Sequence, residues 1–272
     1  MLAHEFTDKR ATYPCFVQPK LDGVRMLARL HQQKVISLES RNGTDFSHLL
    51  PIFQDAVRKI ASRLPADVVA LDGELYRHGS TFQHLVSQVR NKSDPSIAVG
   101  LEYHVYDIFD KTKNGFADRY KTLHAAMSNK EVTLIKLVET TTAVNRNELE
   151  RLLNNAEKLG YEGIMIRTCC TPYELGKRST SLLKYKRFQT DEFVIVSFKE
   201  ARGRDKGTIV FECEAHNGSA FNARPVGTLA ERREMFKIGK TLVGKRMTVK
   251  FQGLSTEGIP RFPVALAIRD YE

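Results

Sequence analysis

The residues most able to do chemistry in this chain fall in six short motifs within the first 186 positions. Each motif combines lysines, arginines or carboxylates with glycine or apolar residues. A neutral lysine amine is a nucleophile, carboxylates bind divalent cations, and lysine or arginine neutralises the charge on a phosphate. In chain order the motifs are KLDGVR at 20–25, SRNG at 40–43, DGEL at 72–75, VYDIFD at 105–110, EGIMIR at 162–167 and LLKYK at 182–186.

The order of the motifs is a stronger signal than any one of them. KLDGVR alone is weak, because a lysine, an aspartate and a glycine at this spacing should arise by chance in about one chain in twenty. The ordered set resembles that of covalent nucleotidyltransferases, and its wording is similar to that of small viral-type ATP-dependent DNA ligases. PRFPVALAIRD at 260–270 is similar to the C-terminal motif of these enzymes, so the resemblance covers nearly the whole chain.

The resemblance implies that the chain transfers AMP from ATP to Lys20, passes it to the 5′ phosphate of DNA and seals a 3′-OH/5′-phosphate nick. An ordinary lysine has a pKa of about 10.4 and is almost wholly protonated at pH 7, so a lysine nucleophile is activated by neighbouring positive charge. The candidates for this role are a divalent cation and four side chains, Arg25, Arg41, Lys184 and Lys186.

The same resemblance implies roles for the carboxylates. Glu162 is expected to bind Mg²⁺ or Mn²⁺, because these cations prefer oxygen ligands. Glu74 is expected to bind the ribose hydroxyls, with Arg41 beside it, and to contribute to the metal site. Asp22 and Asp72 are expected either to shape the same pocket or to serve a structural role.

Adenine needs its own contacts in such a site. Burying a base against an aromatic ring is worth about 1–3 kcal/mol, and the resemblance places Tyr106 there, where many relatives have phenylalanine. Gln18, two residues before the lysine, is expected to read the exocyclic amine of adenine. Arg178 matches a nucleotide-binding arginine of the family, although Lys177 precedes it where a Gly-Arg pair is commoner.

Hydrophobic patterning indicates the elements that must hold these motifs. Up to residue 188, short strand-like runs alternate with amphipathic stretches, which predicts an α+β domain with mixed or antiparallel sheets. Lys184 and Lys186 alternate on a strand, so both are expected to face one way, towards the α-phosphate. Beyond residue 188, short strands, Gly-rich turns and one helix favour a five-stranded barrel. The prediction is a nucleotidyltransferase (ATP-grasp-like adenylation) domain at 1–188 and an OB-fold β-barrel domain at 189–272.

The barrel carries further candidate basic residues. The resemblance implies that Arg261 and Arg269 orient the pyrophosphate during self-adenylylation. The turn ARGRDK lies between two predicted strands and is too short to reach around DNA about 20 Å across, at roughly 3.3 Å per residue. Its basic residues, Arg202, Arg204 and Lys206, are therefore expected to contact phosphates.

Composition favours a nucleic-acid partner. The formal net charge of +10 suits a polyanion, and nicked double-stranded DNA is the expected partner of a monomer. The chain starts without a signal-peptide-like segment and has no apolar run that could cross a bilayer, which predicts a protein of the cytoplasm, with a nuclear or virion setting left open. The four cysteines lack zinc-site spacing and are expected to be reduced packing residues.

Two alternative functions remain at this point. An RNA ligase or an RNA guanylyltransferase would share the lysine chemistry, whereas the direct passage from LLKYK into a barrel and the PRFPVALAIRD ending favour the DNA enzymes. A catalytically dead nucleic-acid binder with an OB fold is a different class. Lysines and carboxylates in this arrangement argue against it, because a pure binder has no need of a lysine beside paired carboxylates.

Overall fold

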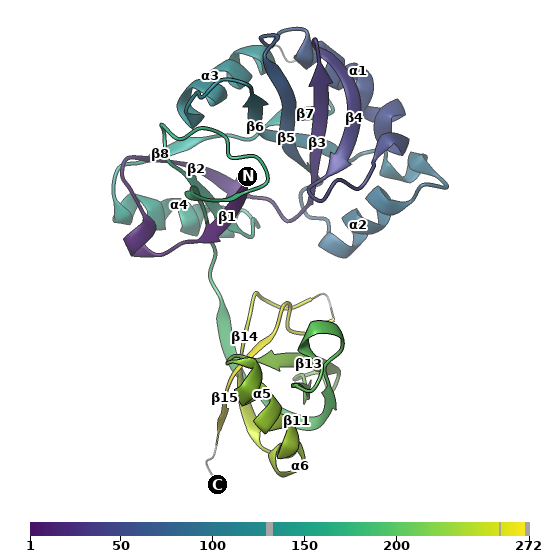
Figure 1. Ribbon diagram of the computed structural model, residues 1–272, viewed down its shortest axis with the longest axis vertical. Helices are drawn as coiled ribbons and strands as arrows, with labels where there is room; N and C mark the ends of the chain where they lie inside the picture. The colour runs from purple at the N-terminus through teal and green to yellow at the C-terminus, as the bar shows by residue number, and fades with distance from the viewer. Residues whose placement is uncertain (129–132, 256, 270–272) are drawn as a thin grey trace. The chain divides into compact units, whose positions relative to one another are not determined.

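The computed structural model describes residues 1–128, 133–255 and 257–269. These residues form two compact units, Met1–Lys186 and Arg187–Glu272 (Figure 1). The division therefore falls two residues before the boundary expected from the sequence. Each unit is described by itself below.

The first sheet of the larger unit has the strand order β4-β3-β5-β6-β7. All neighbouring pairs are antiparallel except β6 and β7, so the sheet is mixed. Its helices bury apolar residues at helical spacing. In α1 (Leu50–Ala61), for example, Phe53, Val57 and Ile60 are buried. The strands are β3 (Val24–His31), β4 (Lys34–Ser40), β5 (Val68–Tyr76), β6 (Glu102–Asp110) and β7 (Ile135–Leu137), and the helices are η2 (Ser47–Leu49), α1 (Leu50–Ala61), α2 (Phe82–Arg90), η3 (Pro95–Ala98) and α3 (Phe116–Met127).

The second sheet of this unit has the order β1-β10-β9-β2-β8. The helix α4 (Arg146–Lys158) supplies buried Leu149 and Leu153 to its core, and the Asn145 side chain caps this helix by accepting a hydrogen bond from the backbone N–H of Glu148. The remaining elements are β1 (Leu2–Glu5), η1 (Asp8–Arg10), β2 (Cys15–Lys20), β8 (Thr141–Ala143), β9 (Gly163–Arg167) and β10 (Arg178–Tyr185).

KLDGVR connects the two sheets. β2 ends at Lys20 in the second sheet, and β3 begins at Val24 in the first. Gly23 makes this crossing possible, because a Cβ atom there would lie 2.4 Å from the Leu75 carbonyl oxygen and 2.7 Å from Glu74 Cγ. The glycine of the motif therefore lets the Lys20 segment lie directly against the strand that carries Glu74.

The smaller unit is a closed five-stranded barrel of order β11-β12-β13-β15-β14, which confirms the predicted barrel. Aromatic and aliphatic side chains fill it, among them Phe193, Ile195 and Phe211. A Thr228–Glu231 capping box begins its longer helix. The elements are β11 (Gln189–Glu200), η4 (Gly203–Asp205), β12 (Ile209–Glu214), β13 (Ala220–Pro225), α5 (Leu229–Lys237), α6 (Gly239–Leu242), β14 (Arg246–Phe251) and β15 (Val264–Arg269).

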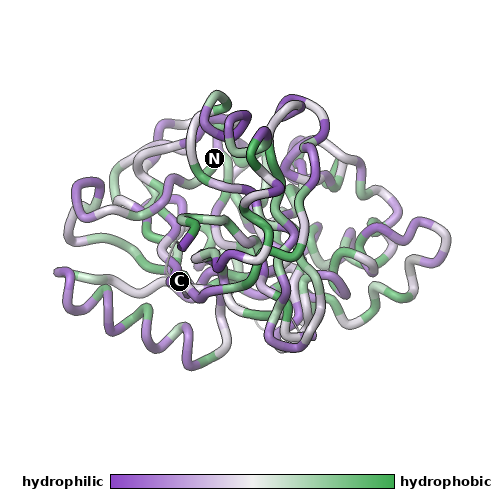
Figure 2. Tube along the Cα trace, turned by 90° about the horizontal axis from the view of Figure 1, so that it is seen from below, coloured by the Kyte–Doolittle hydropathy of each residue, from purple (hydrophilic) through white to green (hydrophobic). Residues whose placement is uncertain are grey.

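Patterning and burial agree along most of the chain. Hydrophilic and hydrophobic residues alternate along the helical coils at the edges of Figure 2, as amphipathic surface helices require. Among the described residues, no helix is long and apolar enough to span a membrane. Cys15 and Cys213 are buried as expected, but Cys169 is only partly buried and Cys170 is exposed, so the packing role predicted for all four cysteines is wrong for this pair.

Candidate active site

Three strand ends bring Lys20, Glu162 and Lys186 together. Lys20 ends β2 and is paired in register with Gly163 of β9. Glu162 directly precedes β9, and Lys186 directly follows β10, the other neighbour of β9. The Glu162 carboxylate forms an ion pair with each lysine: Lys20 Nζ contacts Oε2, and Lys186 Nζ lies 2.7 Å from Oε1.

Gly163 allows this close approach. Its φ of +152° suits glycine, and an added Cβ atom would meet the Tyr185 carbonyl oxygen at 2.4 Å and Lys186 Cβ at 2.9 Å. The backbone N–H of Glu162 also donates to the Lys20 carbonyl oxygen at 3.1 Å. The glycine of EGIMIR therefore sets the distance between the carboxylate and both lysines.

The pKa values of Glu162 and Lys186 both lie below their usual values. Burial by itself would raise the pKa of Glu162, but the adjacent Lys20 and Lys186 ammonium groups hold it below its usual value. Burial lowers the pKa of Lys186, and the nearby charges of Lys20 and Lys184 act in the same direction. The exposed side-chain fractions are 20% for Lys20, 16% for Glu162 and 8% for Lys186, so Lys20 is the most accessible of the three to a ligand.

Glu74 lies beside this cluster on β5. Burial raises the pKa of Glu74 to about 8, and the strongest charges acting on it are Lys20, Arg25, Asp72 and Glu162. Among the described residues, no group donates a hydrogen bond to its carboxylate. A carboxyl group that is mostly protonated at pH 7 can both donate and accept hydrogen bonds.

Arg25 is committed to a neighbour rather than to Lys20. Its guanidinium donates two hydrogen bonds to the carboxylate of buried Asp72, Nε–Oδ1 at 2.8 Å and Nη2–Oδ2 at 2.6 Å. It also donates to the Met1 carbonyl oxygen at 2.6 Å. Although burial alone would raise the pKa of Asp72, Arg25 keeps that pKa low. The geometry therefore does not support the prediction that Arg25 activates the nucleophile, and it gives Asp72 the structural role.

Tyr106 and Gln18 occupy different environments. Tyr106 is partly buried on β6, the strand beside β5 that carries Glu74, and its hydroxyl has no hydrogen-bond partner in the described part of the chain. Gln18 is 2% exposed, and its amide is engaged by protein groups on both its oxygen and its nitrogen. Gln18 Oε1, the atom that would accept from the exocyclic amine of adenine, already accepts from Arg167 and is buried, so the reading of adenine by Gln18 stays a prediction.

Three other predicted residues make no direct contact with the Lys20–Glu162–Lys186 cluster in the described part of the chain, although the charge of Lys184 acts on Lys186. Arg41 is exposed in the turn after β4 and is not among the strongest charges acting on Glu74. Lys184 forms an ion pair with Glu5 at 2.7 Å, so it has a carboxylate partner different from that of Lys186. Arg178 is exposed at the start of β10, where it donates to the Ala3 carbonyl oxygen. The partial burial of Asp22, in contrast, is compatible with a place beside the cluster.

The basic residues of the barrel belong to the second unit. Arg269 donates from Nε to Thr248 Oγ1 at 2.7 Å and pairs with Glu192 at 3.2 Å. The Arg261 guanidinium lies 5.8 Å from the centre of the Phe262 ring. Residue 270, the last of the PRFPVALAIRD motif, lies outside the described residues. Arg202, Arg204 and Lys206 are exposed on the turn around η4.

Sequence reasoning missed Gly23, Gly163 and Arg167. The two glycines stood inside quoted motifs, and their signal was the need for close backbone approach next to a reactive lysine. Arg167 ends the otherwise apolar strand GIMIR and is 4% exposed. A charged residue in such a strand signals a buried partner, but the sequence does not show which residue that partner is.

Known protein families agree with this arrangement. The family model of the ATP dependent DNA ligase domain matches residues 1–186, and that of the DNA ligase OB-like domain matches residues 203–269. The DNA ligase of African swine fever virus (isolate Warthog/Namibia/Wart80/1980) is 33% identical over 272 residues, which cover 93% of this chain and 63% of the viral protein. The chain thus spans less than two thirds of this relative. A DNA ligase of Haemophilus influenzae is 27% identical over 194 residues, or 71% of this chain and 69% of that protein.

Solved structures show the same fold. A Lig E DNA ligase, studied for DNA binding with a minimal scaffold, superposes with a TM-score of 0.78 at 24% identity and covers 99% of this chain and 98% of its own. The Pmar-Lig_PreS3 structure gives 0.81 at 26% identity and covers 99% of this chain and 67% of its own. Because the ligase domain model matches residues 1–186 of 272, the chain belongs to the ATP-dependent DNA ligase family.

Proposed function

We propose that this chain seals 3′-OH/5′-phosphate nicks in duplex DNA through a lysyl-AMP intermediate on Lys20 and a DNA-adenylate. The observation that carries the proposal is the single Glu162 carboxylate that holds both Lys20 Nζ and Lys186 Nζ, with Glu74 beside them. Transfer of an anionic nucleotidyl group requires a nucleophile and groups that stabilise phosphate charge. This site offers a nucleophilic amine, a second ammonium group and two carboxyl groups whose pKa values are shifted in opposite directions.

In the first step, the Lys20 amine attacks the α-phosphorus of ATP. A P–N bond forms and the nitrogen loses a proton to water, while the bond from the α-phosphorus to the oxygen that bridges it to the β-phosphate breaks and pyrophosphate leaves. Lys20 is accessible, whereas Lys186 is nearly buried with its ammonium group held by Glu162. Lys186 is therefore fixed in place to stabilise negative charge that develops on the α-phosphate, without reorganisation during the reaction.

The opposite pKa shifts of the two carboxyl groups favour different ligands: a metal ion for Glu162 and the ribose hydroxyls for Glu74. Glu162 is kept ionised by its lysines and fits an oxygen ligand of Mg²⁺ or Mn²⁺; the bound cation would neutralise phosphate charge. Mg²⁺ takes one or two carboxylates together with phosphates and waters, so Glu162 could hold it with the phosphates of ATP. Glu74, with its pKa near 8, suits ribose hydroxyls better than a metal.

Tyr106 provides the surface for adenine. It lies on β6, beside the strand β5 that carries Glu74, and we propose that a nucleotide whose ribose binds Glu74 places its base on the Tyr106 ring. Stacking of this kind is worth about 1–3 kcal/mol per base. One such site serves one nick, so the proposal of a monomer needs no residue from a second copy of the chain.

A two-stage labelling experiment tests the function. The protein is incubated with labelled ATP or GTP and Mg²⁺, resolved on a denaturing gel, and then offered nicked DNA or nicked RNA. We expect label from ATP alone and sealing of nicked DNA. Label from GTP would indicate a guanylyltransferase, preference for nicked RNA would indicate an RNA ligase, and the absence of label would indicate a nucleic-acid binder.

The turn around η4 supplies candidate DNA contacts in the barrel. Arg202, Arg204 and Lys206 are exposed, and none forms an ion pair with a carboxylate among the residues that the structure describes. The acid of the same turn, Asp205, is engaged instead by Arg224 at 2.9 Å and Arg232 at 3.4 Å. The three basic side chains thus remain available to phosphates.

Replacing these three residues with alanine should weaken binding to nicked DNA and make its salt dependence shallower. For every phosphate that is no longer neutralised, the log–log slope should fall by about 0.9, because fewer counterions are released. Binding is measured across a salt series, with self-adenylylation as the control that should not change. An unchanged slope would remove the turn from the DNA interface.

A further inference from the structure

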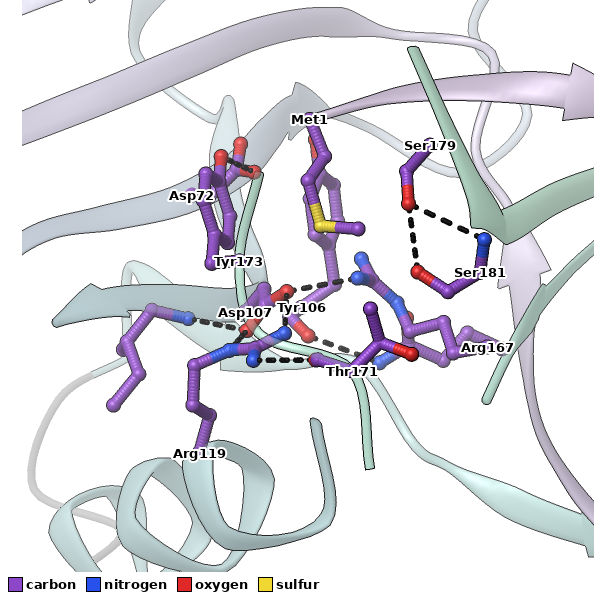
Figure 3. A network of polar contacts seen from close by, with 12 residues as sticks. Met1, Asp72, Tyr106, Asp107, Arg119, Arg167, Thr171, Tyr173, Ser179 and Ser181 are labelled. Atoms are coloured by element: carbon purple, nitrogen blue, oxygen red, sulfur yellow. Dashed lines mark hydrogen bonds and ion pairs between the residues drawn. The ribbon is translucent and has the colours of Figure 1, made fainter. Parts of the chain in front are cut away.

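Two arginines share one buried carboxylate, that of Asp107, next in sequence to Tyr106 (Figure 3). Asp107 of β6 accepts from Arg119 (Nε–Oδ1 at 2.9 Å and Nη2–Oδ2 at 3.1 Å) and from Arg167 (Nη1–Oδ2 at 2.8 Å). The exposed side-chain fractions are 0% for Asp107, 1% for Arg119 and 5% for Arg167. One carboxylate and two guanidinium groups leave a net positive charge in the interior, which is costly, so each arginine needs a reason to be there.

Arg119 has architectural partners. Its Nη1 donates to the Asn114 carbonyl oxygen at 2.7 Å and to the Thr171 carbonyl oxygen at 3.1 Å. Its guanidinium lies near the rings of Phe116 and Tyr173. These contacts join the start of α3 to the loop between β9 and β10. None of these contacts involves Tyr106 or Gln18.

Arg167 instead contacts the residues around the proposed adenine site. Its Nε donates to Gln18 Oε1 at 2.8 Å, and its guanidinium carbon lies 5.5 Å from the centre of the Tyr106 ring and 4.6 Å from that of Phe116. A guanidinium over an aromatic face is attractive. Arg167 therefore supports Tyr106 on one face of its ring.

Gln18 extends this support to the backbone. Because Arg167 can only donate, Gln18 must present its oxygen to Arg167 and its NH₂ group to the other side. That NH₂ group donates to the Tyr106 carbonyl oxygen at 3.1 Å and to Thr140 Oγ1 at 2.9 Å. The amide orientation is thus fixed by three hydrogen bonds, and Tyr106 is held at both its ring and its main chain.

We infer that Arg167 is a positioning residue that fixes Tyr106 for adenine stacking, through the ring face and through Gln18. The inference rests on the proposed function, because it assumes that adenine stacks on Tyr106. Arg167 is not assigned any contact with ATP. Its loss should weaken ATP binding in self-adenylylation without slowing transfer to Lys20.

Arg119 offers a matched control, since both arginines bind the same carboxylate. Arg167→Lys keeps a positive charge near Asp107 but removes the Nε–H donor to Gln18 and the planar group over Tyr106. It should raise the KM for ATP about tenfold with kcat within about twofold, the scale of removing one charge-assisted hydrogen bond. Arg119→Lys should lower the melting temperature at least as much but leave this KM within about twofold. Equal KM changes in both variants would overturn the inference.

Gln18→Met provides a second test that leaves the Asp107 cluster intact. It should raise the KM for ATP to a similar extent, and the Gln18→Met/Arg167→Lys double variant should raise it no further than either single change, because both act through one chain of contacts. An unchanged KM in Gln18→Met, or additive effects in the double variant, would contradict the inference.

Tyr106→Ala separates this inference from the function on which it rests. It should raise the KM for ATP at least as much as Arg167→Lys. If it does so while Arg167→Lys leaves the KM unchanged, the positioning role is wrong and the stacking role stands. If Tyr106→Ala leaves the KM unchanged, adenine does not stack on Tyr106, and both the stacking assignment and the positioning role fail.

Discussion

Replacing Lys20 with alanine should abolish covalent labelling of the protein by ATP, a loss of at least about a thousandfold. The amine is the proposed nucleophile, and no neighbouring group can substitute for it, because Lys186 Nζ is held by Glu162 at 2.7 Å and is only 8% exposed. Intact mass after incubation with ATP and Mg²⁺ is the measurement. The wild-type protein should gain one adenylate, and the variant should gain none.

Lys136 is the control for this experiment. It lies on a strand of the same unit and pairs with Glu102 at 3.7 Å, so Lys136→Ala also removes a lysine with a carboxylate partner. This variant should label normally. The Lys20 variant should still seal a nick whose 5′ end is already adenylylated, at least in part, since the lysine acts before DNA is adenylylated. Persistent labelling of Lys20→Ala would show that another residue carries AMP.

Replacing Glu162 with alanine should reduce nick sealing by at least about a hundredfold, the scale of losing one preorganised charged group. It should also lower the free energy of unfolding by about 1–3 kcal/mol, because Lys20 and nearly buried Lys186 lose this carboxylate. The structure thus predicts a moderate loss of stability, where the sequence alone would predict almost none. Sealing rates and urea unfolding measure the two effects.

Two further variants separate catalysis from folding at this site. Glu39→Ala removes a partly buried ion pair with Arg29 elsewhere in the same unit; it should cost similar stability and leave sealing intact. Glu162→Ala/Lys186→Met removes both ends of the buried pair and should recover stability without recovering activity. Recovery of sealing in the double variant would assign Glu162 a purely structural role.

The sequence indicated the strand-rich architecture and named three residues that the structure brings together, for a physical reason. Period-two and period-3.6 patterns set which residues are buried, so patterning indicated strand-like runs before residue 188, and the motifs DGEL and EGIMIR lie on such strands. Lys20, Glu162 and Lys186 lie at ends of adjacent strands. Motif order indicated that these three residues belong together, and the closed barrel was likewise visible in the spacing of short strands.

Partners distant in sequence were not predictable. Gln18 and Arg167 are 149 residues apart, and Arg25 and Asp72 are 47 apart. Which side chains meet over such separations is set by sheet register, which local patterns do not determine. For the same reason Lys184 was expected to share the environment of Lys186, whereas the parallel pairing of β1 with β10 places Glu5 opposite Lys184.

The barrel closes with joins of unequal strength. β11 and β14 are aligned over six residue pairs, whereas the parallel join of β13 to β15 has only two, Arg224 with Val264 and Pro225 with Ala265. Proline has no N–H to donate. Local opening of a native protein begins where the fewest hydrogen bonds must break, so amide protons at this join exchange with solvent before those of β11. The strand that carries the C-terminal motif can therefore separate from β13 while the barrel core stays folded.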